Sequence, residues 1–242
     1  MRKTFDLDKQ TLDSFNVLIY GVPNTGKTYF LGDALREERK VGAVKFLNIA
    51  GEDGSLTLSG MGLGDVGEHI ETAQDLKDFV VQYSKTPLQA LAVDSLLALS
   101  AKVIQARVGD RLPSLKGEGN EWGDVHWAMA SLVSSLRTCA KYVICTAPAD
   151  RESDPIKGTK YIAPMLPGRQ AREILGRFDF VGYMSATILN KKARWTLSFA
   201  PSEEVATRQR VPSPLLNEIV IPQGGGGWAA FKSAVTNTSK GA

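Results

Sequence analysis

The sequence predicts an α/β fold in which a mostly parallel, twisted sheet carries helices on both faces and ends in an antiparallel hairpin. Short apolar segments alternate with longer segments whose apolar residues recur at helical spacing, and this alternation is typical of a parallel sheet covered by helices. Strands are expected at 16–20, 44–49, 89–93, 142–146, 178–186 and 194–200. Helices are expected at 27–39, 72–83, 95–107, 122–139 and 169–175.

The last two strands differ from the others. Apolar and polar residues alternate strictly along 194–200, which indicates a strand with only one buried face. The polar segment 190–193 separates this strand from the apolar run 181–189 and resembles a tight turn. The two strands therefore form the expected antiparallel hairpin at one edge of the sheet.

The composition predicts one globular domain. The chain has 242 residues, of which 43% are hydrophobic and 23% charged, and this is enough to bury one full core. The expected domain spans 15–222, between an N-terminal arm at 1–14 and a Gly-rich linker with a flexible tail at 223–242.

Several features bear on location. Cys139 and Cys145 are expected as free buried thiols, and the N-terminal residues lack the apolar segment of a secretory signal. No run of eighteen apolar residues occurs, so a cytoplasmic protein without a membrane partner is expected. The net charge of +3 permits nucleic-acid binding without requiring it.

Residues 21–28 form the most informative motif. They are Gly-Val-Pro-Asn-Thr-Gly-Lys-Thr and fit the phosphate-binding pattern G-x-x-x-x-G-K-[ST] at every fixed position, between a predicted strand and a predicted helix. This segment is called the P-loop below. Its glycines let the backbone bend around a phosphate, and its N–H groups point at the anion. Lys27 is expected to reach the β- and γ-phosphates, and the Thr28 hydroxyl to ligate Mg²⁺. The expected cofactors are ATP and Mg²⁺, and the residues expected to bind them are Gly21, Val22, Pro23, Asn24, Thr25, Gly26, Lys27, Thr28 and Tyr29.

Asp94 ends an apolar strand about sixty residues after the P-loop. A carboxylate there is the expected second Mg²⁺ anchor, although it could also cap the next helix, a role that Ser95 could serve equally. Ser95 stands where many P-loop ATPases keep a water-activating Glu, so the general base must come from elsewhere. Glu52 is the first candidate and Asp53 the second; the alternative is that both acids belong to a solvated turn.

Three segments resemble the RecA recombinases. The segment 91–99 resembles their second nucleotide-binding motif, in which the Asp is followed by Ser. Residues 46–52 resemble the strand that carries their catalytic Glu, and 141–146 resemble their next core strand. The similarity extends over 15–200, and the compact length is most similar to phage-encoded RecA-like ATPases of single-strand annealing and recombination. The resemblance implies a RecA-like core, ATP hydrolysis, self-assembly into a ring or filament, and the host cytoplasm as location.

The same resemblance implies contacts with single-stranded DNA. The segments 117–124 and 149–167 lie where RecA proteins have their two DNA-binding loops. The second segment combines cations for phosphates with a tyrosine for base stacking; the alternative is that both are ordinary surface loops. Candidate DNA-contacting residues are Arg151, Lys157, Lys160, Tyr161, Arg169, Lys116 and Trp122. A single-strand-binding protein is a further candidate partner.

Two more catalytic candidates depend on the resemblance. RecA proteins carry a Gln after the core strand that senses the γ-phosphate; here the strand ends in Thr146, which could bind a phosphate or water. Arg208 and Arg210 follow the last strand and are candidates for an arginine finger that reaches a neighbour's γ-phosphate, or belong to a solvated turn.

Two other functions stay open from the sequence. A nucleoside or nucleotide kinase shares the P-loop and would use a lid of arginines, for which Arg169, Arg172 and Arg177 are the candidates. The second is a nucleotide-dependent assembly or loader protein that binds ATP without hydrolysing it.

Overall fold

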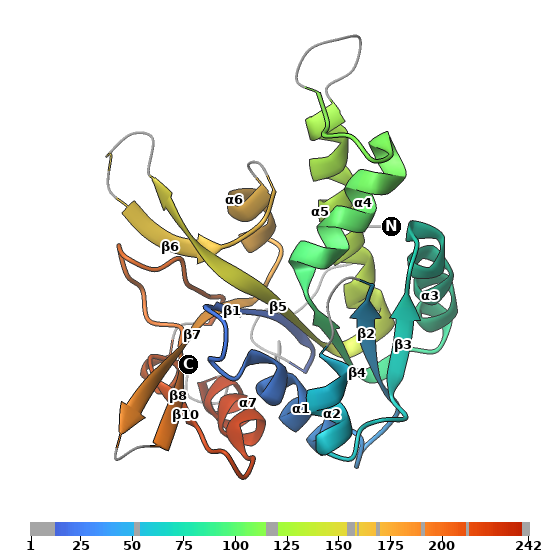
Figure 1. Ribbon diagram of the computed structural model, residues 1–242. Coiled ribbons are helices and arrows are strands. Elements are labelled where there is room, and N and C mark those ends of the chain that lie inside the picture. Colours follow the sequence, from blue (N-terminus) through green and yellow to red (C-terminus); the bar gives the residue numbers. More distant parts are fainter. Residues whose placement is uncertain are drawn as a thin grey trace, which may run out of the picture.

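The structure is a computed structural model (Figure 1) that describes residues 13–50, 54–114, 121–153, 158, 160–167, 170–189, 192–211 and 213–238. The strands are β1 (Phe15–Gly21), β2 (Val44–Ile49), β3 (Gly67–Ile70), β4 (Leu88–Asp94), β5 (Ala140–Ser153), β6 (Lys160–Pro164), β7 (Phe180–Leu189), β8 (Lys192–Ser198), β9 (Arg208–Gln209) and β10 (Ile219–Ile221). The helices are α1 (Lys27–Glu38), α2 (Ser55–Gly60), α3 (Ala73–Lys85), α4 (Leu96–Val108), α5 (Glu121–Cys139), α6 (Gln170–Leu175), the 3-10 helix η2 (Pro214–Leu216) and α7 (Gly227–Thr238).

The strands form one sheet in the order β10-β8-β7-β1-β5-β4-β2-β3. From β7 to β3 all neighbours are parallel, whereas β8 pairs antiparallel with β7 and β10 antiparallel with β8. This confirms the predicted mostly parallel α/β fold with an antiparallel C-terminal hairpin. The carboxyl ends of β1, β5, β4 and β2 meet at one edge, which is where open α/β sheets bind ligands.

Alternating side chains of the strands divide the core into two layers. Ile19 of β1 faces a cluster with α1, α2 and α7, whereas Leu18 and Tyr20 face a cluster with α3, α4 and α5. Figure 1 shows these two groups of helices on opposite sides of β1 and β5. Because both faces are covered, the central strands are apolar throughout, which explains the continuous apolar runs in the sequence. The two cysteines are free and buried, as predicted.

The C-terminal segment corrects the sequence prediction of a flexible tail. Residues 227–238 form α7, and its side chains Trp228 and Phe231 have 0% exposure. The aromatic rings pack among those of β1, α1 and β7, with Trp228 5.8 Å and Phe231 5.6 Å from Phe15 between ring centroids. The helix therefore completes the core on the α1 face. Residues 239–242 of the expected tail, and 1–12 of the expected arm, lie outside the described residues.

Two buried carboxylates of α1 hold α7 in place. Asp33 accepts hydrogen bonds from the backbone nitrogens of Gly226 at 3.1 Å and Trp228 at 2.9 Å, so it satisfies donors at the start of α7. Glu38 accepts from Trp228 Nε1 at 2.6 Å and Lys232 Nζ at 2.6 Å. Burial alone would raise the pKa of Glu38, but its hydrogen bonds from Lys232, Trp228 and Gln89 outweigh the burial and lower it.

The segment after the core strand forms an arm instead of a loop. β5 continues to Ser153 and pairs antiparallel with β6, so that Glu152 lies opposite Tyr161. Figure 1 shows this hairpin projecting from the sheet next to α6. None of the described helices is long and apolar enough to cross a membrane.

Candidate active site

The P-loop connects β1 to α1 at the carboxyl edge of the sheet. Asn24 and Gly26 have positive φ angles of 63° and 89°. A Cβ at Gly21 would lie 2.2 Å from the carbonyl oxygen of Met184 in β7, and one at Gly26 would lie 2.6 Å from the indole of Trp195 in β8. Both fixed glycines of the motif are therefore required by the neighbouring strands as well as by the turn.

The side chain of Lys27 folds back over the P-loop. Its Nζ donates to the carbonyl oxygens of Gly21 and Val22, both at 2.9 Å. The Thr25 hydroxyl donates to the same Val22 oxygen at 2.9 Å. The ammonium group is thus held where phosphate oxygens bind in such loops, and anionic oxygens are stronger acceptors than these neutral carbonyls.

Two threonine hydroxyls contact the carboxylate of Asp94 at the end of β4. The Thr28 hydroxyl donates to Asp94 Oδ2 at 2.7 Å. Thr146, fully buried in the neighbouring strand β5, donates its hydroxyl to Asp94 Oδ1. The Thr146 hydroxyl, expected to face a phosphate or water, is therefore oriented toward the carboxylate instead. Its position suits the orientation of Asp94 rather than direct contact with a phosphate.

The donor set of Thr28 and Asp94 fits Mg²⁺. This ion binds few protein oxygens and takes its other ligands from water and substrate phosphates. The hydroxyl and the carboxylate are already in contact at the start of α1, where the phosphates would lie. In the part of the chain that the structure describes, no cluster of three or more His, Cys, Asp or Glu side chains could hold a metal. A metal bound at Asp94 would thus depend on water and phosphate for its remaining ligands.

A cavity of about 330 Å³ opens over the P-loop. It is lined by loop residues 24–28 together with Tyr29, Thr57 of α2 and Trp195 of β8. A larger cavity of about 540 Å³ runs along α4 and is mostly apolar, but it includes none of the predicted nucleotide-binding residues. The chemistry of the P-loop therefore points to the smaller cavity.

Two residues of this region were not predicted from the sequence. Asn48 lies beside Asp94 in the register of β2 and β4, and its Oδ1 is buried without a hydrogen-bond partner in the described part of the chain. The rule that polar residues at the ends of neighbouring parallel strands converge could have found it. Trp195 could not be found in this way, since its contact with Gly26 depends on where β8 lies in the sheet.

The candidate bases Glu52 and Asp53 lie outside the described residues. The next residue, Gly54, is close to the metal ligands: a Cβ there would lie 3.0 Å from Asp94 Oδ2 and 3.2 Å from Thr28 Cγ2. The chain thus returns to the site directly after the two acids.

The candidate DNA residues that the structure describes do not line the cavity. Arg151 and Lys160 are exposed on the β5–β6 hairpin, whereas Tyr161 is half-buried and donates its hydroxyl to Glu152 at 3.0 Å. Trp122 lies in the first turn of α5, with its ring 6.3 Å from that of His126. The candidates outside the described residues are Lys116, Lys157 and Arg169.

Arg208 and Arg210 do not line the cavity over their own P-loop. Arg208 pairs with Val181 near the start of β7, beside the amino half of β1. Arg210 Nε is 2.7 Å from the buried carboxylate of Asp179, which also binds Arg137 at 3.1 Å. The Arg210 guanidinium thus pairs with a buried carboxylate of its own subunit while its side chain stays 45% exposed, and this pairing weighs against a role as finger.

The chain is similar to a known protein family and to solved structures. A family model described as an AAA domain matches residues 14–211. Among solved structures, the flagellar accessory protein FlaH from Methanocaldococcus jannaschii is similar, with 14% sequence identity and a TM-score of 0.46 over 86% of this chain and 84% of that chain. No curated protein sequence matches the chain.

Proposed function

This chain belongs to the AAA domain family, and we propose that it binds ATP with Mg²⁺ in the P-loop cavity and hydrolyses the bond to the γ-phosphate. The observation that carries the proposal is that Lys27 and Thr28 line one cavity and that the Thr28 hydroxyl contacts the Asp94 carboxylate. Each group has a separate task, since Lys27 neutralises phosphate charge while Thr28 and Asp94 hold the metal.

The protein groups act mainly by placing charge. Lys27 exchanges the carbonyls of Gly21 and Val22 for phosphate oxygens, and the loop N–H groups bind the same anion. Bound Mg²⁺ would neutralise charge on the β- and γ-phosphates. Thr146 fixes the Asp94 carboxylate through its hydroxyl, and this carboxylate would hold the metal's water ligands.

Glu52 is the proposed general base. A water oxygen attacks the γ-phosphorus, the bond to the β-phosphate oxygen breaks, and the water proton passes to the Glu52 carboxylate. The position of Gly54 supports this assignment, because a Cβ there would lie 3.0 Å from Asp94 Oδ2 and Glu52 precedes Gly54 by two residues.

We further propose that the ATP-bound protein assembles on single-stranded DNA, as a ring or filament, in recombination, annealing or replication. The exposed cations Arg151 and Lys160 on the projecting β5–β6 hairpin support a contact with phosphates. Arg208 keeps its proposed role as a finger toward a neighbouring subunit.

The test is the rate of phosphate release from ATP with and without single-stranded DNA. The proposal expects Mg²⁺-dependent release that DNA accelerates. Phosphate transfer to added nucleosides would instead identify a kinase, and tight ATP binding without turnover would identify a loader that works by binding alone.

A further inference from the structure

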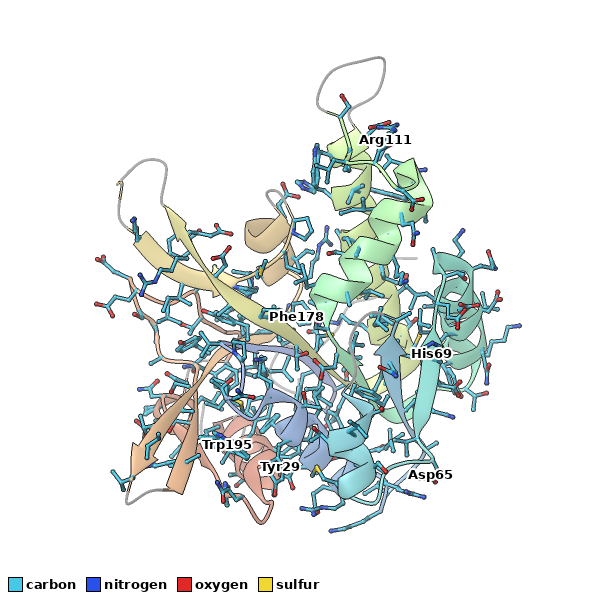
Figure 2. All side chains as sticks on the ribbon, in the orientation of Figure 1. Tyr29, Asp65, His69, Arg111, Phe178 and Trp195 are labelled. Atoms are coloured by element: carbon cyan, nitrogen blue, oxygen red, sulfur yellow. The ribbon has the colours of Figure 1, made fainter. Side chains whose placement is uncertain are left out.

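The P-loop cavity has an aromatic wall that phosphate binding does not require. Trp195 of β8 and Tyr29 of α1 both line the cavity, with ring centroids 5.2 Å apart and planes inclined at 50°. Figure 2 labels the two side chains next to each other beside α1. Phosphates and metals are bound by N–H groups and charges, whereas flat aromatic faces are suited to flat ligands such as nucleobases.

Trp195 is fixed in place by the sheet. Its backbone pairs with Ala186 of β7 on one side and with Ile221 of β10 on the other. Its ring lies directly against Gly26, where an added Cβ would come within 2.6 Å of the indole. A ring held so firmly beside the last glycine of the P-loop needs little ordering when a ligand arrives.

Tyr29 is fixed from the other side. Its hydroxyl donates to the carbonyl oxygen of Gln223, and the Gln223 amide donates in turn to the carbonyl oxygen of Ala193 at 3.0 Å. The polar end of the tyrosine is thus engaged with the segment before α7. What Tyr29 presents to the cavity is its ring.

The indole nitrogen gives a second, independent observation. Trp195 Nε1 is buried and has no hydrogen-bond partner in the described part of the chain. Buried donors are nearly always paired in folded proteins, so this unpaired nitrogen, on a residue that lines the cavity, is compatible with an acceptor that comes from a ligand or water. A bound ligand that carries ring nitrogens or hydroxyl oxygens could supply it.

We propose that Trp195 and Tyr29 form a base subsite for the nucleoside triphosphate whose phosphates the P-loop holds. The proposal rests on the proposed function and names the part of the ligand that this wall recognises. Stacking on aromatic faces accepts every base, but its strength increases with the stacked area. The subsite therefore favours purine over pyrimidine nucleotides. ATP and GTP are expected to bind more tightly than CTP.

The test compares nucleotides with inorganic tripolyphosphate, which has the phosphates but no base. Dissociation constants are measured by calorimetry on the full chain for ATP, GTP, CTP and tripolyphosphate with Mg²⁺. Trp195→Leu is expected to raise the dissociation constants of ATP and GTP roughly 5- to 150-fold, the range that corresponds to the loss of one base–aromatic stack. Tripolyphosphate affinity is expected to stay unchanged. Trp195→Phe keeps a ring and should recover most of the ATP affinity.

Trp127→Leu is the matched control, since this tryptophan is 71% exposed on α5 and does not line the cavity. If Trp195→Leu lost as much affinity for tripolyphosphate as for ATP, Trp195 would serve only to support Gly26 by packing against it. Unchanged ATP affinity in folded Trp195→Leu would also overturn the subsite. If wild type binds neither ligand, the proposed function itself fails.

Tryptophan fluorescence provides a readout that does not depend on the folding of the leucine variant. ATP is expected to quench wild-type emission while tripolyphosphate leaves it unchanged, and the difference should vanish in Trp195→Phe. The same quench from both ligands would contradict the base subsite.

Discussion

Replacing Thr146 with valine distinguishes two roles for its buried hydroxyl. Val has nearly the same shape, so the change removes one donor from Asp94 Oδ1 without leaving a large cavity. A hydrogen bond to a charged group contributes roughly 1.5–3 kcal/mol, and the lower end applies because Asp94 is only half-buried. We therefore expect about a tenfold increase in the Mg²⁺ concentration that gives half-maximal ATPase activity.

The assay is a Mg²⁺ titration of phosphate release at saturating ATP. If Thr146 positions Asp94, kcat at high Mg²⁺ changes little, and Thr146→Ser restores the normal midpoint because it keeps the hydroxyl. If Thr146 contacts the γ-phosphate or water directly, kcat falls at every Mg²⁺ concentration while the midpoint stays constant. That second pattern would refute the positioning role.

Three further predictions address the base, the C-terminal helix and the hairpin. Glu52→Gln should bind ATP normally but turn over roughly a hundred- to ten-thousandfold more slowly; normal turnover in this variant combined with loss in Asp53→Asn would move the base to Asp53. Because the folded pKa of Glu38 is lowered, its stabilisation is present above the ordinary glutamate pKa of 4.5 and is lost as pH falls through the folded pKa. Urea denaturation should therefore show a loss of stability below about pH 4.5 that is smaller in Glu38→Gln, and identical pH profiles would exclude this role. Replacing Arg151 and Lys160 with Gln should flatten the plot of log K against log salt for single-stranded DNA by roughly 1.4, about 0.7 for each lost phosphate contact; an unchanged slope in anisotropy titrations would remove the hairpin from the DNA interface.

The parallel core could be predicted because its signals are local. Each central strand is a continuous apolar run, and the P-loop pattern marks the turn between the first strand and α1. Asp94 could be located as well, since it directly ends a strand. These features depend on short stretches of chain, so their patterns can be recognised without knowledge of tertiary contacts.

The C-terminal helix could not be predicted in the same way. It begins at the last glycine of the segment 224–227, which locally favours a flexible linker, and its burial depends on Asp33 and Glu38 almost two hundred residues earlier. The hairpin arm was missed because the segment 149–167 was interpreted as a loop from its position after the core strand. In the sheet, Pro148 lies opposite Gly21, and its carbonyl oxygen accepts from Met165 at 2.8 Å, so the proline interrupts the strand without ending it.

The aromatic wall of the cavity could be predicted from the sequence only in part, for the same reason. Tyr29 follows the P-loop and was included among the nucleotide-binding residues, whereas Trp195 was recognised only as part of an alternating edge strand. Its place beside Gly26 follows from the sheet order, in which β8 comes after β7 and β7 after β1. Sheet order is a long-range property that local periodicity does not contain.

The most direct test of the proposed activity is phosphate release from ATP by wild type and by Lys27→Ala, each with Mg²⁺ and with excess EDTA. The account predicts turnover only for wild type with Mg²⁺, because the alanine variant loses the cation that pairs with the phosphates. Equal turnover by Lys27→Ala, or wild-type turnover in EDTA, would contradict hydrolysis at this site.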